Sequence, residues 1–280
     1  MSTNVSTGRK MLPPALLVAL AFVGILVVNG LANALPLNGA NTGVLSDEIP
    51  NLFVPAGLTF SVWGLIYLLL TGYVVALLKE AWRGGSGAWT GSDALLFLVN
   101  AAANIGWIFA WHWRLVGLAM ALMLVILGTL IALEQGNQLK LGPGGALDPA
   151  AGGKNRGLAA RRFFLTVPLR VYLGWISVAT IANATALLVK TGWDGFGLDP
   201  RFWTVLVIIA GLAVALGFSL WKRQVAAPLV VVWAYAGIVV KRLGTDASYS
   251  TAVWAAALAS AILILISLLP GRLISPAEKK

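Results

Sequence analysis

Long apolar stretches alternate with short polar ones along the whole chain. An uncharged apolar run of about 18 or more residues predicts a membrane-spanning helix, because about 20 residues at 1.5 Å each cross the hydrocarbon. Gly-rich polar segments separate these runs and are typical of loops. The pattern predicts eight spans, at about 12–34, 54–78, 93–112, 115–134, 163–189, 202–221, 225–240 and 250–269. We therefore expect an all-α integral membrane protein that crosses the bilayer several times.

Composition supports this expectation and excludes several kinds of site. Hydrophobic residues make up 59% of the chain and charged residues 11%, whereas a soluble domain carries roughly a quarter charged residues. There is no cysteine and only one histidine, so a disulfide, a cysteine nucleophile or a metal centre built from protein ligands is not expected. We recognise no Ser-His-Asp set and no phosphate-binding Gly-rich loop. No catalytic residue and no metal ligand is therefore assigned.

The formal charge of +10 is distributed unevenly between the predicted loops. With both termini in the cytoplasm, the outer side receives only Arg114, Lys190, Arg201, Lys241 and Arg242. The cytoplasmic side receives Arg9, Lys10, Lys79, Arg83, Lys140, Lys154, Arg156, Arg161, Arg162, Lys222, Arg223, Arg272, Lys279 and Lys280. Such a bias sets the orientation of membrane proteins. It predicts a bacterial inner (plasma) membrane protein in contact with the lipid bilayer, and it makes nucleic acid an unexpected partner.

The first span shares features with a secretory signal peptide. Arg9 and Lys10 precede its apolar run, and Ala32-Asn33-Ala34 resembles a cleavage site with small residues. Its apolar run is longer than the 7–15 residues of a usual signal core. We favour a helix that is retained over a signal that is cleaved.

Twelve tryptophans are present. Tryptophan gathers at membrane–water interfaces, where the headgroups suit its amphipathic ring. That preference accounts for the tryptophans near span ends or in loops: Trp82, Trp89, Trp113, Trp193, Trp203, Trp221 and Trp254.

Three spans carry rings and amides that this preference does not explain. In the third span, positions i, i+4, i+7 and i+11 of one helix face are Asn100, Asn104, Trp107 and Trp111. The fifth span has Trp175, Ala179, Ala182 and Asn183 on one face, and the second has Phe60, Trp63, Gly64 and Tyr67. Because an amide in hydrocarbon is costly, these faces should turn inward. Two interpretations stay open, which are interhelical hydrogen bonds with ring packing, or a pocket for a flat apolar ligand.

The same residues resemble the motifs of the TspO/MBR family, the tryptophan-rich sensory proteins related to the mitochondrial translocator protein. The family helix P-P-G-x-x-F-x-x-V-W-x-x-x-Y is similar to Pro55-Ala56-Gly57, Phe60, Val62-Trp63 and Tyr67. Its N-x-x-W helix is matched by Asn104 and Trp107, with Trp111 where Phe is usual, and its W-x-x-x-A-x-x-x-N helix by Trp175, Ala179 and Asn183.

This resemblance covers residues 12 to 190 and implies a TspO-like five-helix bundle over residues 1–190. Residues 191–280 would then form an additional three-helix segment. The resemblance also implies that the bundle binds a tetrapyrrole such as protoporphyrin, a haem-like molecule or another small apolar ligand. The ligand-binding residues that it implies are Phe60, Trp63, Tyr67, Asn104, Trp107, Trp111, Trp175, Ala179 and Asn183. Family members often form homodimers, so a second copy is a candidate partner.

Four functions remain open at this point, and we favour them in the order given. The first is a membrane receptor or sensor that binds a porphyrin-like ligand. The second is a transporter of that ligand, although Asp and Glu are scarce in the spans, which argues against a coupled carrier. The third is a non-enzymatic subunit or assembly factor with a membrane-complex partner. The fourth is an enzyme that degrades a bound tetrapyrrole.

His112 and Arg170 could each bind a ligand, but we favour a simpler explanation for both. His112 could ligate haem iron, but we expect an interfacial histidine. Arg170 lies inside the fifth span and could meet a ligand carboxylate. We expect it instead to pair with Glu134, which ends the fourth span on the same side.

Overall fold

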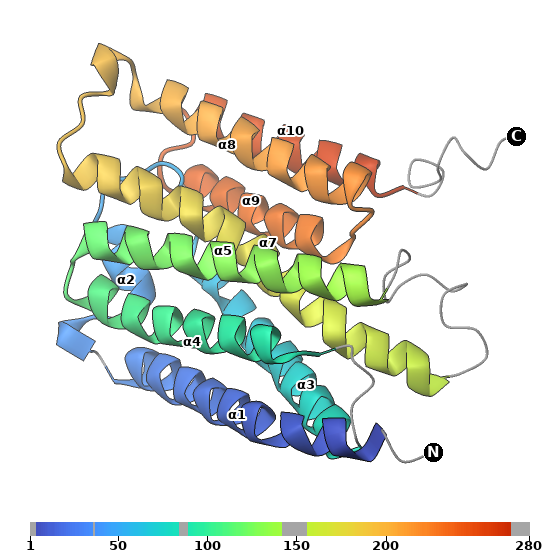
Figure 1. The fold of residues 1–280 in the computed structure, drawn as a ribbon. Helices are drawn as coiled ribbons and strands as arrows, with labels where there is room; N and C mark the ends of the chain where they lie inside the picture. The colour runs from blue at the N-terminus through green and yellow to red at the C-terminus, as the bar shows by residue number, and fades with distance from the viewer. Residues whose placement is uncertain (1–3, 36, 84–88, 142–155, 270–280) are drawn as a thin grey trace, which may run out of the picture. The chain divides into compact units, whose positions relative to one another are not determined.

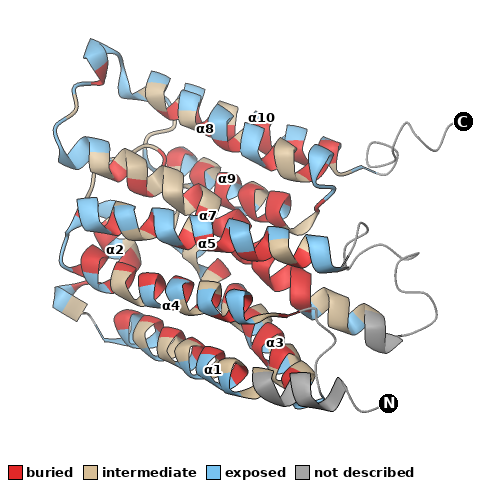
Figure 2. Ribbon diagram, viewed as in Figure 1, coloured by how far each residue is buried: buried red, intermediate tan, exposed pale blue. Residues whose placement is uncertain are grey.

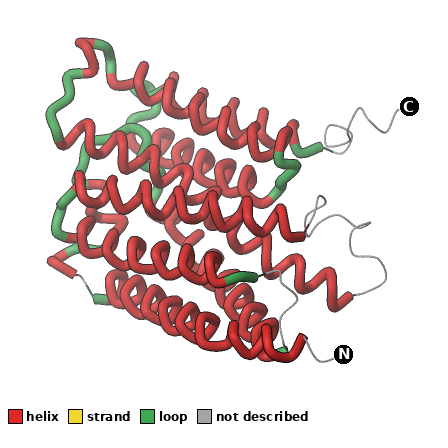
Figure 3. Tube along the Cα trace, viewed as in Figure 1, coloured by secondary structure: helices red, strands yellow, loops and turns green. Residues whose placement is uncertain are grey.

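The structure is a computed structural model that describes residues 4–35, 37–83, 89–141 and 156–269. Within these ranges the chain is helical and contains no strand (Figure 3). The α-helices are α1 (Asn4–Ala34), α2 (Thr42–Asp47), α3 (Val62–Trp82), α4 (Gly91–His112), α5 (Val116–Leu141), α7 (Arg156–Lys190), α8 (Pro200–Leu216), α9 (Ala226–Thr245) and α10 (Thr251–Ser267). Short 3₁₀ helices are η1 (Leu37–Gly39), η2 (Gly57–Ser61) and η3 (Gly195–Gly197), and η4 (Gly217–Trp221) is a π-helical turn.

Among the described residues, 7 helices are long and apolar enough to cross a membrane, and the apolar helix Thr251–Ser267 is shorter. The predicted all-α membrane fold of about eight helices is therefore confirmed. Several helix ends differ from the predicted spans: α1 begins earlier, at Asn4, and α7 at Arg156, while α5 continues to Leu141. The α-helix of the second span begins later than predicted, at Val62, after the 3₁₀ helix η2. A hydropathy window registers the part of a helix that suits hydrocarbon and misses its polar extensions.

Several predictions concern residues that the structure does not describe. Parts of the two polar loops, residues 84–88 and 142–155, lie outside the described ranges. So do four of the cations expected in the cytoplasm, which are Lys154, Arg272, Lys279 and Lys280. Arg9, Lys10 and Arg156 lie in helical backbone, but their side chains are not described. The cytoplasmic position of the termini stays a prediction.

The chain divides into two compact units. The first unit consists of Met1–Thr42 and Trp63–Leu173, and the second consists of Gly43–Val62 and Gly174–Lys280. Helix α7 contributes its first half to one unit and its second half to the other. The predicted division into residues 1–190 and 191–280 stays a prediction.

In the first unit, α4 packs against both α1 and α5 (Figure 1). Thr90 and Asp93 form a capping box at the start of α4, and the Asp93 carboxylate also pairs with Lys140 of α5. A cap of this kind satisfies backbone N–H groups that the first helical turn leaves without partners. Buried and exposed residues alternate along α4 with helical spacing (Figure 2). One face of α4 therefore packs in the interior of the first unit.

In the second unit, α9 packs against α8, α10 and η2. Two close approaches of other elements to α9 depend on glycine. A Cβ atom on Gly174 of α7 would lie 2.6 Å from the carbonyl oxygen of Ala227, and one on Gly211 of α8 would collide with the hydroxyl of Tyr235. That hydroxyl donates a hydrogen bond of 2.6 Å to the carbonyl oxygen of Ile208. Glycine lets neighbouring membrane helices approach closely, so α9 is tightly enclosed.

Candidate functional site

The polar and aromatic face of α4 is buried in the first unit. The exposed fractions are 2% for Asn100, 1% for Asn104, 7% for Trp107 and 6% for Trp111. The prediction that this face turns inward is confirmed. Asn100 donates to the carbonyl oxygen of Ile126 (3.1 Å) and to Thr129 Oγ1 (2.8 Å), both on α5. Asn100 therefore joins two helices, which is the simpler of the two interpretations of these amides.

Asn104 connects three helices of the first unit. Its Oδ1 accepts a hydrogen bond of 2.9 Å from Asn29 Nδ2 on α1, and its Nδ2 donates one of 2.9 Å to the hydroxyl of Tyr172 on α7. Asn29 also donates to the carbonyl oxygen of Ile25 (3.0 Å). A buried amide is costly unless it is hydrogen-bonded, and this network lowers that cost. It also fixes where the Tyr172 ring lies.

Tyr172 and two motif residues of α3 form an aromatic cluster in the first unit. The rings of Trp63 and Tyr67 stack with centroids 5.5 Å apart and an angle of 25° between their planes. The Tyr172 ring meets Trp63 edge-on at 5.8 Å and 62°. Both geometries suit the quadrupoles of aromatic rings. Trp63 and Tyr67 are half-buried, whereas Tyr172 is 3% exposed. The cluster therefore has a buried base and a partly accessible outer surface.

The tryptophans at the end of α4 make a second stack in the first unit. The Trp107 and Trp111 rings lie 5.6 Å apart at an angle of 14°. Trp111 Nε1 donates to the carbonyl oxygen of Thr42 at 3.3 Å. This bond attaches the segment after α1 to the end of α4.

The remaining predicted residues belong to the second unit. Phe60 of η2 meets Trp175 of α7 edge-on, with centroids 5.8 Å apart and an angle of 82°. Trp175 is 3% exposed and Asn183 4%. Asn183 Nδ2 donates to the carbonyl oxygen of Ala179 in its own helix, at 2.9 Å. Each unit thus brings together a subset of the predicted residues, and the prediction that all nine touch one ligand stays a prediction.

Tyr172 is the residue of this cluster that the sequence analysis missed. It precedes Trp175 by three positions and Ala179 by seven, so all three share one face of a helix. This spacing is visible in the sequence. The hydroxyl of Tyr172 is also the hydrogen-bond partner of Asn104, which no local pattern reveals.

Comparison with protein families decides what the chain is related to. The family model described as TSPO-like protein matches residues 15–269. The chain belongs to this family. No curated protein and no solved structure matches it. The match runs through α10, so it reaches well past residue 190, where the resemblance to the motif helices ends. Membership, together with the apolar helices, makes this TSPO-like protein a multi-pass integral membrane protein of the sensor or receptor type.

An ion pair lies inside the first unit of the TSPO-like protein. Arg170 Nε donates to Glu134 Oε1 at 3.1 Å, and the two side chains are 9% and 6% exposed. Gln138 donates to the same carboxylate oxygen at 2.6 Å. The prediction that Arg170 pairs with Glu134 is confirmed, which leaves this guanidinium engaged within the protein.

His112 is enclosed by the protein at the end of α4. The residue is fully buried, and its Nδ1 lies 2.7 Å from the carbonyl oxygen of Ile108. Asn38 of η1 donates to the backbone oxygen of His112 at 2.8 Å. Burial within the protein does not fix depth in the membrane, so the expectation of an interfacial histidine stays a prediction.

The tryptophans assigned to the membrane interface differ in exposure, and Trp193, Trp203 and Trp254 are half-buried. Trp82, Trp113 and Trp221 are 79%, 50% and 88% exposed, as expected of rings at headgroup level. Trp89 is only 6% exposed. Its burial shows that a place in a loop does not by itself expose a ring.

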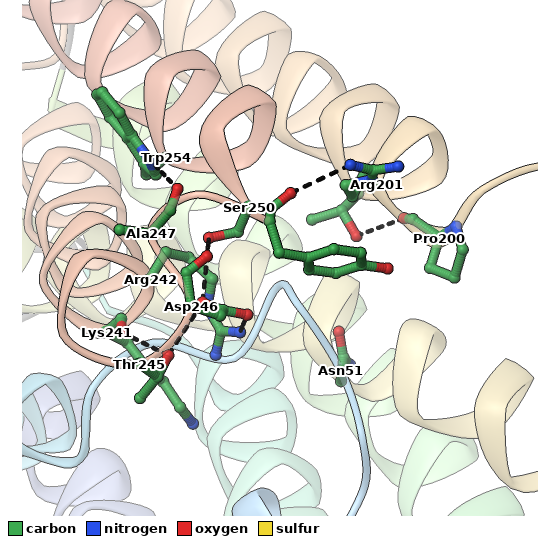
Figure 4. A network of polar contacts seen from close by, with 12 residues as sticks. Asn51, Pro200, Arg201, Lys241, Arg242, Thr245, Asp246, Ala247, Ser250 and Trp254 are labelled. Carbon is green, nitrogen blue, oxygen red and sulfur yellow. Dashed lines mark hydrogen bonds and ion pairs between the residues drawn. The ribbon is translucent and has the colours of Figure 1, made fainter.

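Polar contacts of the second unit gather where α8, α9 and α10 begin or end (Figure 4). Arg242 Nη1 donates to Asp246 Oδ2 at 3.0 Å, and Ser250 Oγ donates to Asp246 Oδ1 at 3.0 Å. Arg201 lies over the Tyr249 ring at 4.6 Å. Hydrogen bonds from Arg201 lower the pKa of the Asp199 carboxyl to about 2. In the part of the chain that the structure describes, no group of three or more His, Cys, Asp or Glu could hold a metal.

Proposed function

We propose that this TSPO-like protein is a membrane sensor or receptor that binds a flat, apolar, porphyrin-like molecule through its motif rings. The observation that carries the proposal is the cluster of Trp63, Tyr67 and Tyr172. The first two rings are half-buried, so they offer faces on which a planar ligand can stack. Stacked aromatic pairs add about 0.5–1.5 kcal/mol beyond the burial of their area, so two rings can supply a substantial part of the affinity.

The amide network gives the rings a fixed base. Because Asn104 donates to the Tyr172 hydroxyl and Tyr172 meets Trp63 edge-on, Asn104 holds the cluster through Tyr172. We propose that Asn104 acts on the ligand in this indirect way, through the position of the rings. A preorganised site loses less entropy when its ligand binds. Phe60, Trp175, Ala179 and Asn183 are proposed as further ligand contacts on the strength of the family motif.

The orientation in the membrane belongs to the same proposal. The Lys and Arg bias supports a bacterial inner membrane with both termini in the cytoplasm. Trp63 and Trp107 would then lie in the outer half of the bilayer. The ligand would reach its rings from the outer side or from the lipid.

The proposal is tested by titrating purified protein in nanodiscs with metal-free protoporphyrin IX and following its Soret absorption. Trp63→Ala removes one stacking face, and we expect affinity to fall roughly tenfold, since about 1.4 kcal/mol corresponds to a factor of ten. Trp82→Ala is the matched control, because Trp82 lies on the same helix and is 79% exposed. If both variants titrate like the unaltered protein, the Trp63 cluster does not bind the ligand.

A further inference from the structure

We propose that helix α9 is a seat, that is, a packing surface, for the chain from Asp47 to Phe60. This seat sets the position of the Phe60 ring against the Trp175 ring. The seat is one face of α9, defined by Trp233, Gly237 and Lys241. It gives the C-terminal helices of this chain a positioning role. The inference rests on the proposed function for the identity of the ligand, whereas the contact between η2 and α9 stands independently of it.

The three seat residues occur at i, i+4 and i+8 of α9 and therefore share one helix face. Each of them holds a different part of the chain between α2 and α3. Lys241 pairs with Asp47 at the end of α2. Gly237 accepts, at its carbonyl oxygen, a hydrogen bond of 3.0 Å from the N–H of Ala56.

Trp233 makes the contact nearest to Phe60. Its Nε1 donates to the carbonyl oxygen of Thr59 at 2.9 Å. Thr59 is 2% exposed and directly precedes Phe60 in η2. The 3₁₀ helix η2 has no side-chain cap at its first residue, so bonds from outside do more to fix it. Two backbone groups of this segment are thus held by α9.

Gly237 permits this contact because it lacks a side chain. A Cβ atom at position 237 would lie 2.9 Å from both Cβ and Cγ2 of Thr59 and closer still to Oγ1. Real Cβ atoms essentially never approach other atoms this closely. Any larger residue at 237 must therefore push η2 away from α9. Gly244 of the same helix has no atom within 4 Å of the corresponding position, so close approach is not a general property of the glycines of α9.

The other end of the segment is anchored to α7. Asn51 Nδ2 donates to Thr185 Oγ1 at 2.6 Å. The chain from Asn51 to Thr59 is therefore fixed at both ends within the second unit. With η2 fixed in this way, Phe60 meets the Trp175 ring edge-on at 5.8 Å. A shift of η2 moves Phe60 directly, since the two residues that are held, Ala56 and Thr59, lie within four residues of it.

The test compares Gly237→Ala with the matched control Gly244→Ala. Hydrogen–deuterium exchange of the peptide covering residues 52–62 reports the seat without any ligand. We expect this peptide to exchange faster in Gly237→Ala and at the unaltered rate in Gly244→Ala. We also expect Gly237→Ala to weaken protoporphyrin IX binding about tenfold, which corresponds to about 1.4 kcal/mol, and Gly244→Ala to change it less than twofold.

A second substitution tests whether the effect passes through Thr59. The three atoms nearest to such a Cβ belong to the Thr59 side chain, so Gly237→Ala combined with Thr59→Gly should regain slow exchange and most of the affinity. General damage to the second unit would not be repaired by this change. If Gly237→Ala does not fold, Trp233→Phe removes the indole N–H donor, together with part of the ring, and should show the same two effects at smaller size.

The outcomes separate the seat from the ligand proposal. Unchanged exchange of residues 52–62 in Gly237→Ala overturns the seat. Faster exchange with unchanged affinity overturns the positioning role. Faster exchange in a protein that does not bind protoporphyrin IX in its unaltered form supports the seat and refutes the proposed function.

Discussion

Removing one partner of the Arg170–Glu134 pair should destabilise the protein strongly, because both side chains are more than nine-tenths buried. Arg170→Met removes the cation that pairs with the buried Glu134 carboxylate, and Glu134→Leu leaves the guanidinium without its carboxylate. Breaking a buried ion pair in this way costs about 3–5 kcal/mol. At about 1.4 kcal/mol for each factor of ten, the unfolding equilibrium shifts by roughly 10² to 4 × 10³.

Replacing both residues should cost much less. A well-packed apolar pair is often as stable as the buried ion pair that it replaces, so Arg170→Met with Glu134→Leu should lie within about 2 kcal/mol of the unaltered protein. Unfolding in mixed micelles of dodecyl maltoside and dodecyl sulfate, followed by circular dichroism, measures all three variants. Lys79→Met removes a charge from the exposed end of α3 and serves as the control for charge alone.

Additive losses would refute this reasoning. If the double variant loses the sum of the two single losses, the side chains do not depend on each other and the pair is not a coupled unit. The ligand offers a second check. Arg170→Met should affect protoporphyrin IX and its dimethyl ester alike, because the guanidinium is engaged by Glu134. A selective loss for the free acid would show that Arg170 binds a ligand carboxylate.

Two further predictions concern the second unit. Gly211→Ala should destabilise it by about 1–3 kcal/mol, as overpacking a core does, because a Cβ atom there collides with the Tyr235 hydroxyl. Gly128→Ala, where a Cβ atom meets open space, is the control in the same micelle assay. Equal stability of the two variants would contradict the clash. The ion pair between Asp199 and Arg201 should persist in mild acid. Since the pKa of Asp199 is held at about 2, below about 3.9 in an unfolded chain, its contribution is complete above pH ~4 and is lost as the pH falls through 2. Thermal unfolding of Asp199→Asn and unaltered protein between pH 2 and 6 measures this, and a difference that does not shrink toward pH 2 would disprove it.

The sequence predicts the helices well because their signal is local. Leucine, valine and isoleucine fill each span, and the polar breaks fall where the helices end. The inward face of α4 could also be predicted, since Asn104 and Trp107 follow helical spacing and an amide avoids lipid. The pairing of Arg170 with Glu134 follows from the same argument, because two isolated charges at one depth attract each other.

Contacts between distant segments could not be predicted in the same way. Thr59 and Trp233 are 174 positions apart, and neither residue carries a local sign of the other. The 3₁₀ helix η2 owes part of its position to that contact. The burial of His112 could not be predicted for a similar reason, because Asn38 of the distant η1 donates to its backbone oxygen. Periodicity shows which face of a helix turns inward, but it does not show what covers that face.

The distance along the chain between η2 and α9 has a consequence for biogenesis. Synthesis proceeds at about 5–20 residues per second, so the 174 positions between Thr59 and Trp233 take roughly 10–35 s to translate. During that time α3 has already left the ribosome, while the Trp233 indole that donates to the Thr59 carbonyl oxygen does not yet exist. The Phe60 region must therefore wait in the translocon or the lipid without the indole N–H that donates to the Thr59 carbonyl. Insertion chaperones would meet the protein in that interval, and translational pausing before α9 would lengthen it.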